Sequence, residues 1–129
     1  MSAAAVIYVK DLDRMSAFYE RCLGFETVDR GDGYRVLEAA GWTLSLVRAA
    51  EEILTAIEVP APTRRRTGVP VKLGFGVRSI EGTRAGAQAL GGQIDPPDTA
   101  WDFGDFRRCD GVDPEGNVIQ LLEALAATT

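Results

Sequence analysis

The chain has 129 residues, of which 46% are hydrophobic, so it can bury one continuous core as a single domain or as two small interlocked modules. Its formal net charge of -5 argues against a non-specific nucleic-acid-binding protein, because such proteins need a positive field to displace counterions from phosphates. No segment approaches the roughly 20 apolar residues of a membrane span, and residues 1–5 lack the charged flank of a secretory signal, so the sequence indicates a soluble cytoplasmic protein.

The first half of the chain has the pattern of a strand, a helix and three further strands. Residues 5–9 are apolar with β-branched and aromatic members, which predicts a strand. Asp11 is a good N-cap, and Gly24 is placed to end the following helix in the left-handed conformation. The apolar residues on one predicted face of this helix are Met15, Phe18, Tyr19, Cys22 and Leu23. Three strand-like runs, separated by glycine-containing turns, follow at residues 25–29, 34–39 and 42–47.

The second half repeats this order. Residues 71–77 predict a strand, Ser79 an N-cap, and Gly91 with Gly92 the end of a helix, at the same spacing as in the first half. Such self-similarity indicates duplication of one supersecondary unit. We therefore divide the chain into a first module over residues 1–59, a linker over residues 60–70 and a second module over residues 71–125. An insertion in the second module, around residues 95–104, predicts a loop long enough to have a function.

Two further features are interpreted as structural. Cys22 and Cys109 are too few and too far apart for a disulfide framework or a cysteine-based zinc site, so both are predicted to be reduced thiols. The basic run Arg64-Arg65-Arg66 lies among prolines and a glycine, which favours an exposed linker over a binding motif.

Several motifs, in this order, resemble the vicinal oxygen chelate superfamily of glyoxalases, bleomycin-resistance proteins and extradiol dioxygenases. They are Val9-Lys10-Asp11-Leu12, Cys22-Leu23-Gly24-Phe25, Phe75-Gly76-Val77 and Asp113-Pro114-Glu115-Gly116-Asn117. The resemblance covers nearly the whole chain and implies an α+β fold. Two tandem β-α-β-β-β modules would form a curled mixed sheet, or cup, with helices on its outer face, as one glyoxalase-like domain over residues 1–129. It also implies a homodimer.

The resemblance further implies where metal ligands would stand. Metal-using members carry His, Glu or Gln on the first and last strand of each module, and the corresponding positions here are Ala4 or its neighbour, Ser45, Lys72 and Gln120. Alanine has no donor and lysine brings a positive charge, so Gln120 alone of this set retains a plausible ligand oxygen. The chain also contains no histidine, the commonest imidazole ligand. We therefore expect neither a metal site nor a cofactor.

Strand alternation predicts which side chains would line the cup, since positions two apart share a face of a sheet. The predicted ligand-binding residues are Tyr8, Ser45, Lys72 and Gln120 on strands, with Trp101 and Phe103 of the insertion as lid or stacking residues. Lys72 could attract an anionic oxygen, act as a general base, or extend to water at the rim. Gln120 and the two aromatic residues could likewise contact a ligand or serve packing alone. These alternatives stay open.

The leading functional hypothesis is metal-independent binding of a small organic molecule, similar to that of bleomycin-resistance proteins. The first alternative is an enzyme of the same superfamily, of the lyase, isomerase or dioxygenase type, or a metal-free catalyst using Lys72 and Tyr8; no catalytic residue is assigned. The second alternative is a regulatory or partner-binding domain, which would present a large apolar surface patch. The sequence identifies neither the ligand nor a pathway, because one fold serves many chemistries.

Overall fold

The computed structural model describes residues 3–50, 52–53 and 63–126, which form two tandem modules. The first module contains, in chain order, β1 (Ala3–Val9), α1 (Leu12–Leu23), β2 (Glu26–Gly31), β3 (Tyr34–Ala39) and β4 (Trp42–Arg48). The second contains β5 (Leu73–Gly76), α3 (Ile80–Ala87), the 3-10 helix η1 (Gln88–Leu90), β6 (Gln93–Ile94), the 3-10 helix η2 (Pro97–Thr99), β7 (Trp101–Phe103), β8 (Phe106–Val112) and β9 (Val118–Ala124). The expected boundary between residues 59 and 60 lies outside the described residues, as do linker residues 60–62.

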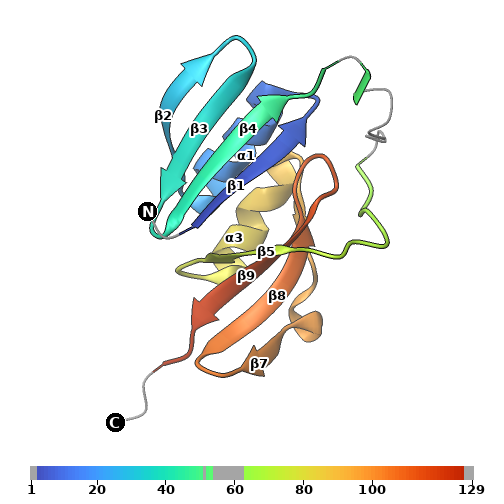
Figure 1. The fold of residues 1–129 in the computed structure, drawn as a ribbon. Helices are drawn as coiled ribbons and strands as arrows, with labels where there is room; N and C mark the ends of the chain where they lie inside the picture. The colour runs from blue at the N-terminus through green and yellow to red at the C-terminus, as the bar shows by residue number, and fades with distance from the viewer. Residues whose placement is uncertain (1–2, 51, 54–62, 127–129) are drawn as a thin grey trace.

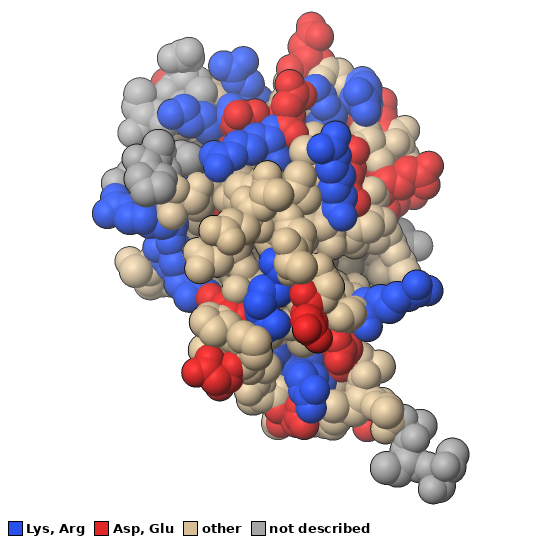
Figure 2. Space-filling model, turned by 180° about the vertical axis from the view of Figure 1, so that it is seen from behind, with Lys and Arg blue, Asp and Glu red and all other residues tan. Residues whose placement is uncertain are grey.

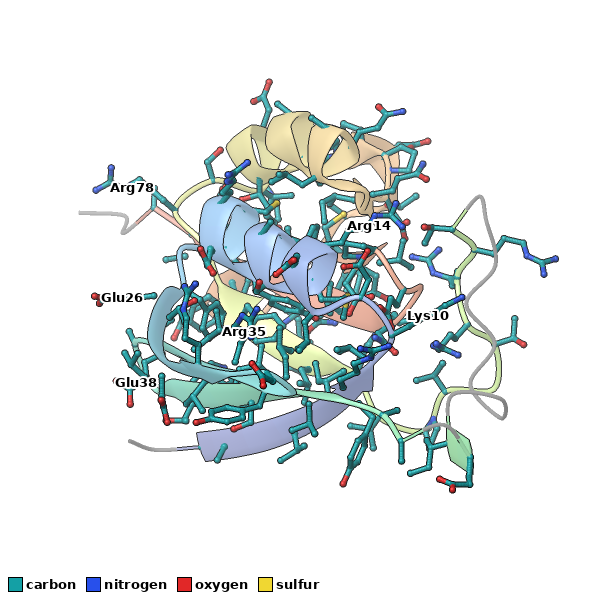
Figure 3. All side chains as sticks on the ribbon, turned by 90° about the horizontal axis from the view of Figure 1, so that it is seen from above. Lys10, Arg14, Glu26, Arg35, Glu38 and Arg78 are labelled. Atoms are coloured by element: carbon teal, nitrogen blue, oxygen red, sulfur yellow. The ribbon has the colours of Figure 1, made fainter. Side chains whose placement is uncertain are left out.

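Each module folds into one mixed sheet, and the two sheets share a strand order. In the first sheet, β1 pairs in parallel with β4 in the order β1-β4-β3-β2. In the second, β5 pairs in parallel with β9 in the order β5-β9-β8-β6, and β7 is added beside β8. Figure 1 shows both sheets from the front with α1 and α3 behind them, and Figure 3 shows the two helices from above, on one side of the first sheet. The predicted α+β fold of paired modules with helices on the outer face is confirmed.

The helix boundaries follow from capping residues that the sequence identified. The Asp11 side chain accepts a hydrogen bond from the Arg14 backbone N–H at 3.0 Å, and α1 stops at Gly24, whose φ is +76°. In the second module, Ser79 caps α3 in the same manner, accepting the Gly82 N–H at 3.0 Å. The predicted continuous helix beyond Ser79 instead changes to the 3-10 helix η1 before Gly91 ends it. Tightening of the last turn is common where a helix ends.

The core lies between the helices and the sheet faces that the helices cover. Its centre is an aromatic cluster in which the Tyr19 ring meets those of Phe18, Phe25 and Phe75 edge-on, at centroid distances of 5.3 to 6.0 Å. Trp42 joins this cluster from the first sheet and donates its indole N–H to the Gly74 carbonyl of β5 at 3.2 Å. One core therefore spans both modules, so neither sheet could bury its helix-facing side alone.

The turn between β8 and β9, which the sequence analysis gave only as a motif of the resemblance, carries two buried carboxylates. Asp113 is fully buried and accepts the Tyr19 hydroxyl at 2.8 Å. Burial raises the pKa of Asp113, and burial together with the nearby carboxylate raises the pKa of Tyr19 well above its usual value, so the phenol stays protonated as a donor. Glu115, 2% exposed, accepts the backbone N–H groups of Lys10 and Asp11 at 2.8 to 3.0 Å. Lys10, labelled in Figure 3, stands where β1 leads into α1.

The insertion differs from the predicted loop because it contains regular structure. After η2, β7 pairs with β8 in antiparallel register, with Trp101 opposite Arg108 and Phe103 opposite Phe106. Gly104, with φ of +62°, turns the chain between the two strands. A strand of three residues is too short to display alternation in the sequence, which explains why it was missed.

The basic run of the linker is fastened to the second module. Arg65 forms an ion pair with Asp95, in which Nη2 lies 2.8 and 2.7 Å from the two carboxylate oxygens. Arg66 donates from its backbone N–H to the Gly116 carbonyl at 2.9 Å and from Nε to the Asn117 side chain at 3.1 Å. Arg65 is exposed, as expected of a linker, whereas Arg66 is half-buried.

The surface on the helix side carries interspersed acidic and basic side chains rather than a field of one sign (Figure 2). Among the described residues, no helix combines the length and the apolar character that crossing a membrane requires.

Cys22 and Cys109 are both free thiols, and Cys109 is fully buried. Burial raises the pKa of the Cys22 thiol to about 11. We expect iodoacetamide to alkylate Cys22 at pH 8 roughly a hundredfold more slowly in the folded protein than in urea, because only about one thiol in a thousand is ionised three units below its pKa. The folded-state rate should rise towards pH 11. Mass spectrometry of timed, quenched samples measures both rates, and equal labelling with and without urea would contradict the prediction.

Candidate functional site on the open face of the sheets

The faces of the two sheets that lie away from the helices are open, and alternation decides which side chains they carry. On the first sheet, Val6 lies opposite Ser45 and Tyr8 opposite Val47. Val6 and Tyr8 are 57% and 54% exposed, whereas Leu44, which points the other way, is fully buried. On the second sheet, the same alternation puts residues 118, 120 and 122 of β9 on the open face, and the helix-facing residues 119 and 121 are buried.

Four side chains form a connected polar network on this open face: Arg108 and Asp110 of β8, Gln120 of β9, and Lys72. Lys72 was expected on a strand over residues 71–77 but lies just before β5, which begins at Leu73. Lys72 Nζ is paired with Asp110 Oδ2 at 2.8 Å. Gln120 Nε2 donates to Asp110 Oδ1 at 3.2 Å, and Gln120 Oε1 accepts from Arg108 Nη1 at 3.0 Å. Gln120 is 9% exposed, so these partners largely enclose its amide. The network fixes which end of the amide accepts and which donates.

Aromatic rings of β7 cover the two cations of the polar network. Lys72 Nζ lies 5.7 Å from the centre of the Trp101 ring, and Arg108 Cζ lies 5.3 Å from that of Phe103. Both distances are within the range of cation–π attraction. Trp101 and Phe103 are 40% and 68% exposed, so each ring has one face towards the cation and much of its remaining surface towards solvent.

An apolar cavity of about 440 Å³ opens beside the polar network, between the edges of the two sheets. We call it the interstrand slot. Its lining is mainly apolar and includes Val6, Tyr8, Val69, Val71, Leu73 and Val118. Arg66 and Asn117 provide its polar end. The volume falls within the range of small-molecule pockets, and apolar walls with a few polar groups are typical of them.

The structure brings four of the six predicted site residues together: Lys72, Gln120, Trp101 and Phe103. Tyr8 lies apart from them, in the wall of the interstrand slot. Ser45 is half-buried on β4, the strand beside β1, and is not among the residues that line the described slot.

Sequence reasoning missed Asp110 and Arg108, which hold Gln120, and Arg66 of the slot. Alternation along β8 indicates that residues 108 and 110 share a face. Their placement against Gln120 depends on the register of β8 and β9, in which Asp110 is directly opposite Gln120. Charged residues at positions 108 and 110 are a signal that the sequence offers. Interpreting that signal requires knowing that β8 pairs with β9 and in which register.

The four positions where the superfamily resemblance implies metal ligands do not fit a metal ion. Ala4 and Ser45 supply no strong ligand, and the Lys72 ammonium, paired with Asp110, stands where a cation would have to bind. The Gln120 oxygen already accepts from Arg108. Within the described ranges, moreover, no three His, Cys, Asp or Glu side chains converge on one point. No step of the chemistry can therefore be derived through a metal at these positions.

Comparison with protein families gives one match over almost the whole chain. Residues 3–121 match the family model described as Glyoxalase/Bleomycin resistance protein/Dioxygenase superfamily. No curated protein sequence matches the chain.

Solved structures with a similar fold are numerous. A glyoxalase/bleomycin resistance protein/dioxygenase family enzyme from Burkholderia phytofirmans PsJN has a TM-score of 0.71 and 21% identity, over 95% of this chain and 97% of that one. The fosfomycin resistance protein FosX from Listeria monocytogenes has a TM-score of 0.67 and 16% identity, over 95% and 92%. A glyoxalase-related enzyme from Fulvimarina pelagi has a TM-score of 0.66 and 20% identity, over 95% and 87%. At sequence identities of 16 to 21%, these similarities establish the fold alone, and function has to be argued from the residues of the site.

Proposed function

Since this chain belongs to the glyoxalase/bleomycin resistance protein/dioxygenase superfamily, we propose that it binds a small organic molecule on the open face of its sheets without a metal ion. The observation that carries this proposal is the interstrand slot, an apolar cavity of about 440 Å³ that adjoins the polar network. Apolar walls supply affinity by removing ligand surface from water, and a few fixed polar groups supply orientation. The two lie side by side here, since Val118 of the slot stands next to Lys72 and Asp110 in an adjoining hollow.

Metal independence is supported by the occupation of the implied ligand positions. A divalent ion would have to displace the Lys72–Asp110 ion pair and compete with Arg108 for Gln120. Each exchange costs contacts at 2.8 to 3.0 Å that the protein already makes. We assign no catalytic step, because Lys72 Nζ is already engaged by the Asp110 carboxylate at 2.8 Å.

We also propose that the protein works as a homodimer in the cytoplasm, with neither nucleic acid nor membrane as a partner. Large apolar side chains on and around the open face are left exposed in one chain: Val6, Tyr8, Val71 and Phe103 are 54 to 68% accessible. A second copy that covered part of this face would bury them and enclose the ligand. Sedimentation at several concentrations measures the subunit count.

The binding proposal is tested with two neutral or singly charged planar probes, 1-naphthamide and 1-naphthoate, by calorimetry with and without a chelator. We expect saturable binding of at least one probe, unchanged by the chelator. The variant Val71→Trp, which places an indole at the mouth of the slot, should weaken that binding by at least about tenfold through steric exclusion. Val71 is 66% exposed, so the larger side chain can be added without disturbing the core.

The matched control is Val28→Trp, since Val28 is also exposed, at 49%, but lies on β2 away from the slot. It should leave affinity unchanged. Loss of binding in the chelator would contradict metal independence, and failure of both probes to bind would overturn the proposed function. If the Val71→Trp protein and the native protein bound the probe with equal affinity, the probe would not bind in the interstrand slot.

A further inference from the structure

The charges of the polar network do not balance. Asp110 is neutralised by Lys72 at 2.8 Å, whereas Arg108 contacts an amide oxygen and an aromatic ring. In the part of the chain that the structure describes, no carboxylate lies within ion-pair distance of Arg108. The network therefore carries one excess positive charge on the open face of the second sheet.

Arg108 also has an unused donor. Its Nε atom is buried and no described group accepts a hydrogen bond from it, while Nη1 is engaged by Gln120. A buried polar group without a partner is costly, and guanidinium donors gain most from a pair of oxygens that accept from Nε and Nη2 together. A carboxylate has that geometry. Gln120, itself held by Asp110, fixes the far side of the guanidinium and leaves its Nε edge for such a partner.

Space for a ligand exists on the same strands. Arg108 and Gly76 lie on opposite sides of Leu122, in register across β8, β9 and β5. A Cβ atom at Gly76 would meet nothing within 4 Å, so the sheet face is open on the β5 side of Leu122. The Phe103 ring covers the guanidinium but is 68% exposed. It can therefore change rotamer and uncover Arg108 without disturbing the core.

From these observations we propose that Arg108 makes the open face selective for small organic carboxylates, with the carboxylate on its Nε edge and the body of the ligand running along β9, past Gln120, to Val118 in the wall of the interstrand slot. This inference rests on the proposed binding function and adds to it the class of ligand. Arg108 supplies the positive charge on a face whose four implied metal positions offer only the Gln120 oxygen as a plausible metal ligand.

The experiment compares 1-naphthoate with its neutral isostere 1-naphthamide in calorimetry of the full chain. We expect the native protein to bind the carboxylate about ten- to a hundredfold more tightly than the amide, as charge-assisted hydrogen bonds do. Arg108→Gln should abolish the preference by weakening naphthoate binding and leaving naphthamide binding nearly intact. Arg108→Lys, which keeps the charge but loses the planar fork, should retain part of it and serves as the second variant if glutamine disturbs the fold.

The matched control is Arg107→Gln. Arg107 is the next residue on β8, points to the opposite face and is paired with Asp102 at 2.9 Å, so its removal should leave the preference unchanged. Equal affinity of the native protein for both probes overturns this inference alone, as does an undiminished preference in Arg108→Gln and Arg108→Lys. Binding of neither probe overturns the proposed function as well.

Discussion

Replacing Glu115 by alanine should cost about 3 to 5 kcal/mol of unfolding free energy, since the change strips the acceptor from two backbone N–H groups at the start of α1. Glu115 is 2% exposed and holds Lys10 N and Asp11 N at 2.8 to 3.0 Å, so no water can take its place without rearrangement. A loss of that size is a large share of the 5 to 15 kcal/mol that typically stabilises a domain. Urea denaturation followed by circular dichroism measures it.

Two variants control this prediction. Glu115→Gln keeps one acceptor oxygen at nearly the same shape and should lose roughly half as much, about 1.5 to 3 kcal/mol. Glu81→Ala removes an exposed glutamate from the first turn of α3 and should cost less than about 1 kcal/mol. A loss below about 1 kcal/mol for Glu115→Ala would show that the buried carboxylate contributes no more than a surface charge.

The second large effect is expected at Gly116. Its φ of +82° is a left-handed conformation, and a Cβ atom there would collide with the carbonyl oxygen of Arg64 in the linker. Gly116→Ala should therefore cost about 3 kcal/mol or more, combining left-handed strain with displacement of the linker. Thermal and urea unfolding measure the loss.

Gly41 separates the two contributions. Its φ of +81° is nearly the same, but a Cβ atom there would meet nothing within 4 Å. Gly41→Ala should cost only the backbone strain, roughly 1 to 2 kcal/mol. The difference between the two losses of unfolding free energy is the cost of moving the linker away from the turn. Equal losses would mean that the linker moves at no measurable cost.

Local rules were sufficient to predict the elements and their order. The caps at Asp11 and Ser79 and the stop at Gly24 are short-range chemistry, readable from neighbouring residues, and each is found as expected. The buried face also follows from alternation, since Leu44 and Leu121, the neighbours in sequence of Ser45 and Gln120, are fully buried.

What could not be predicted depends on contacts between distant residues. Glu115 reaches Lys10 across 105 positions, and nothing near either residue signals the other. Arg108 joins Gln120 through the offset of two strands, which sequence alone leaves undetermined. The ion pair between Lys72 and Asp110 also depends on the pairing of distant strands, which neighbouring residues do not reveal. The role of the site in binding a ligand stays a prediction.

The carboxylates that satisfy the helix starts have a consequence for biosynthesis. Glu115 serves the N-terminus of α1, and Glu123 accepts the Ile80 N–H at 2.7 Å at the start of α3. Both acceptors belong to the hairpin of β8 and β9, so each helix is synthesised before the glutamate that accepts from the backbone N–H groups at its start. A nascent chain can form α1 with Asp11 as its N-cap. The hydrogen bonds from Lys10 and Asp11 to Glu115 form only after β8, β9 and their turn have left the ribosome. Complete folding of both modules therefore requires synthesis of β8 and β9. A premature stop before residue 115 leaves both helix starts without these acceptors.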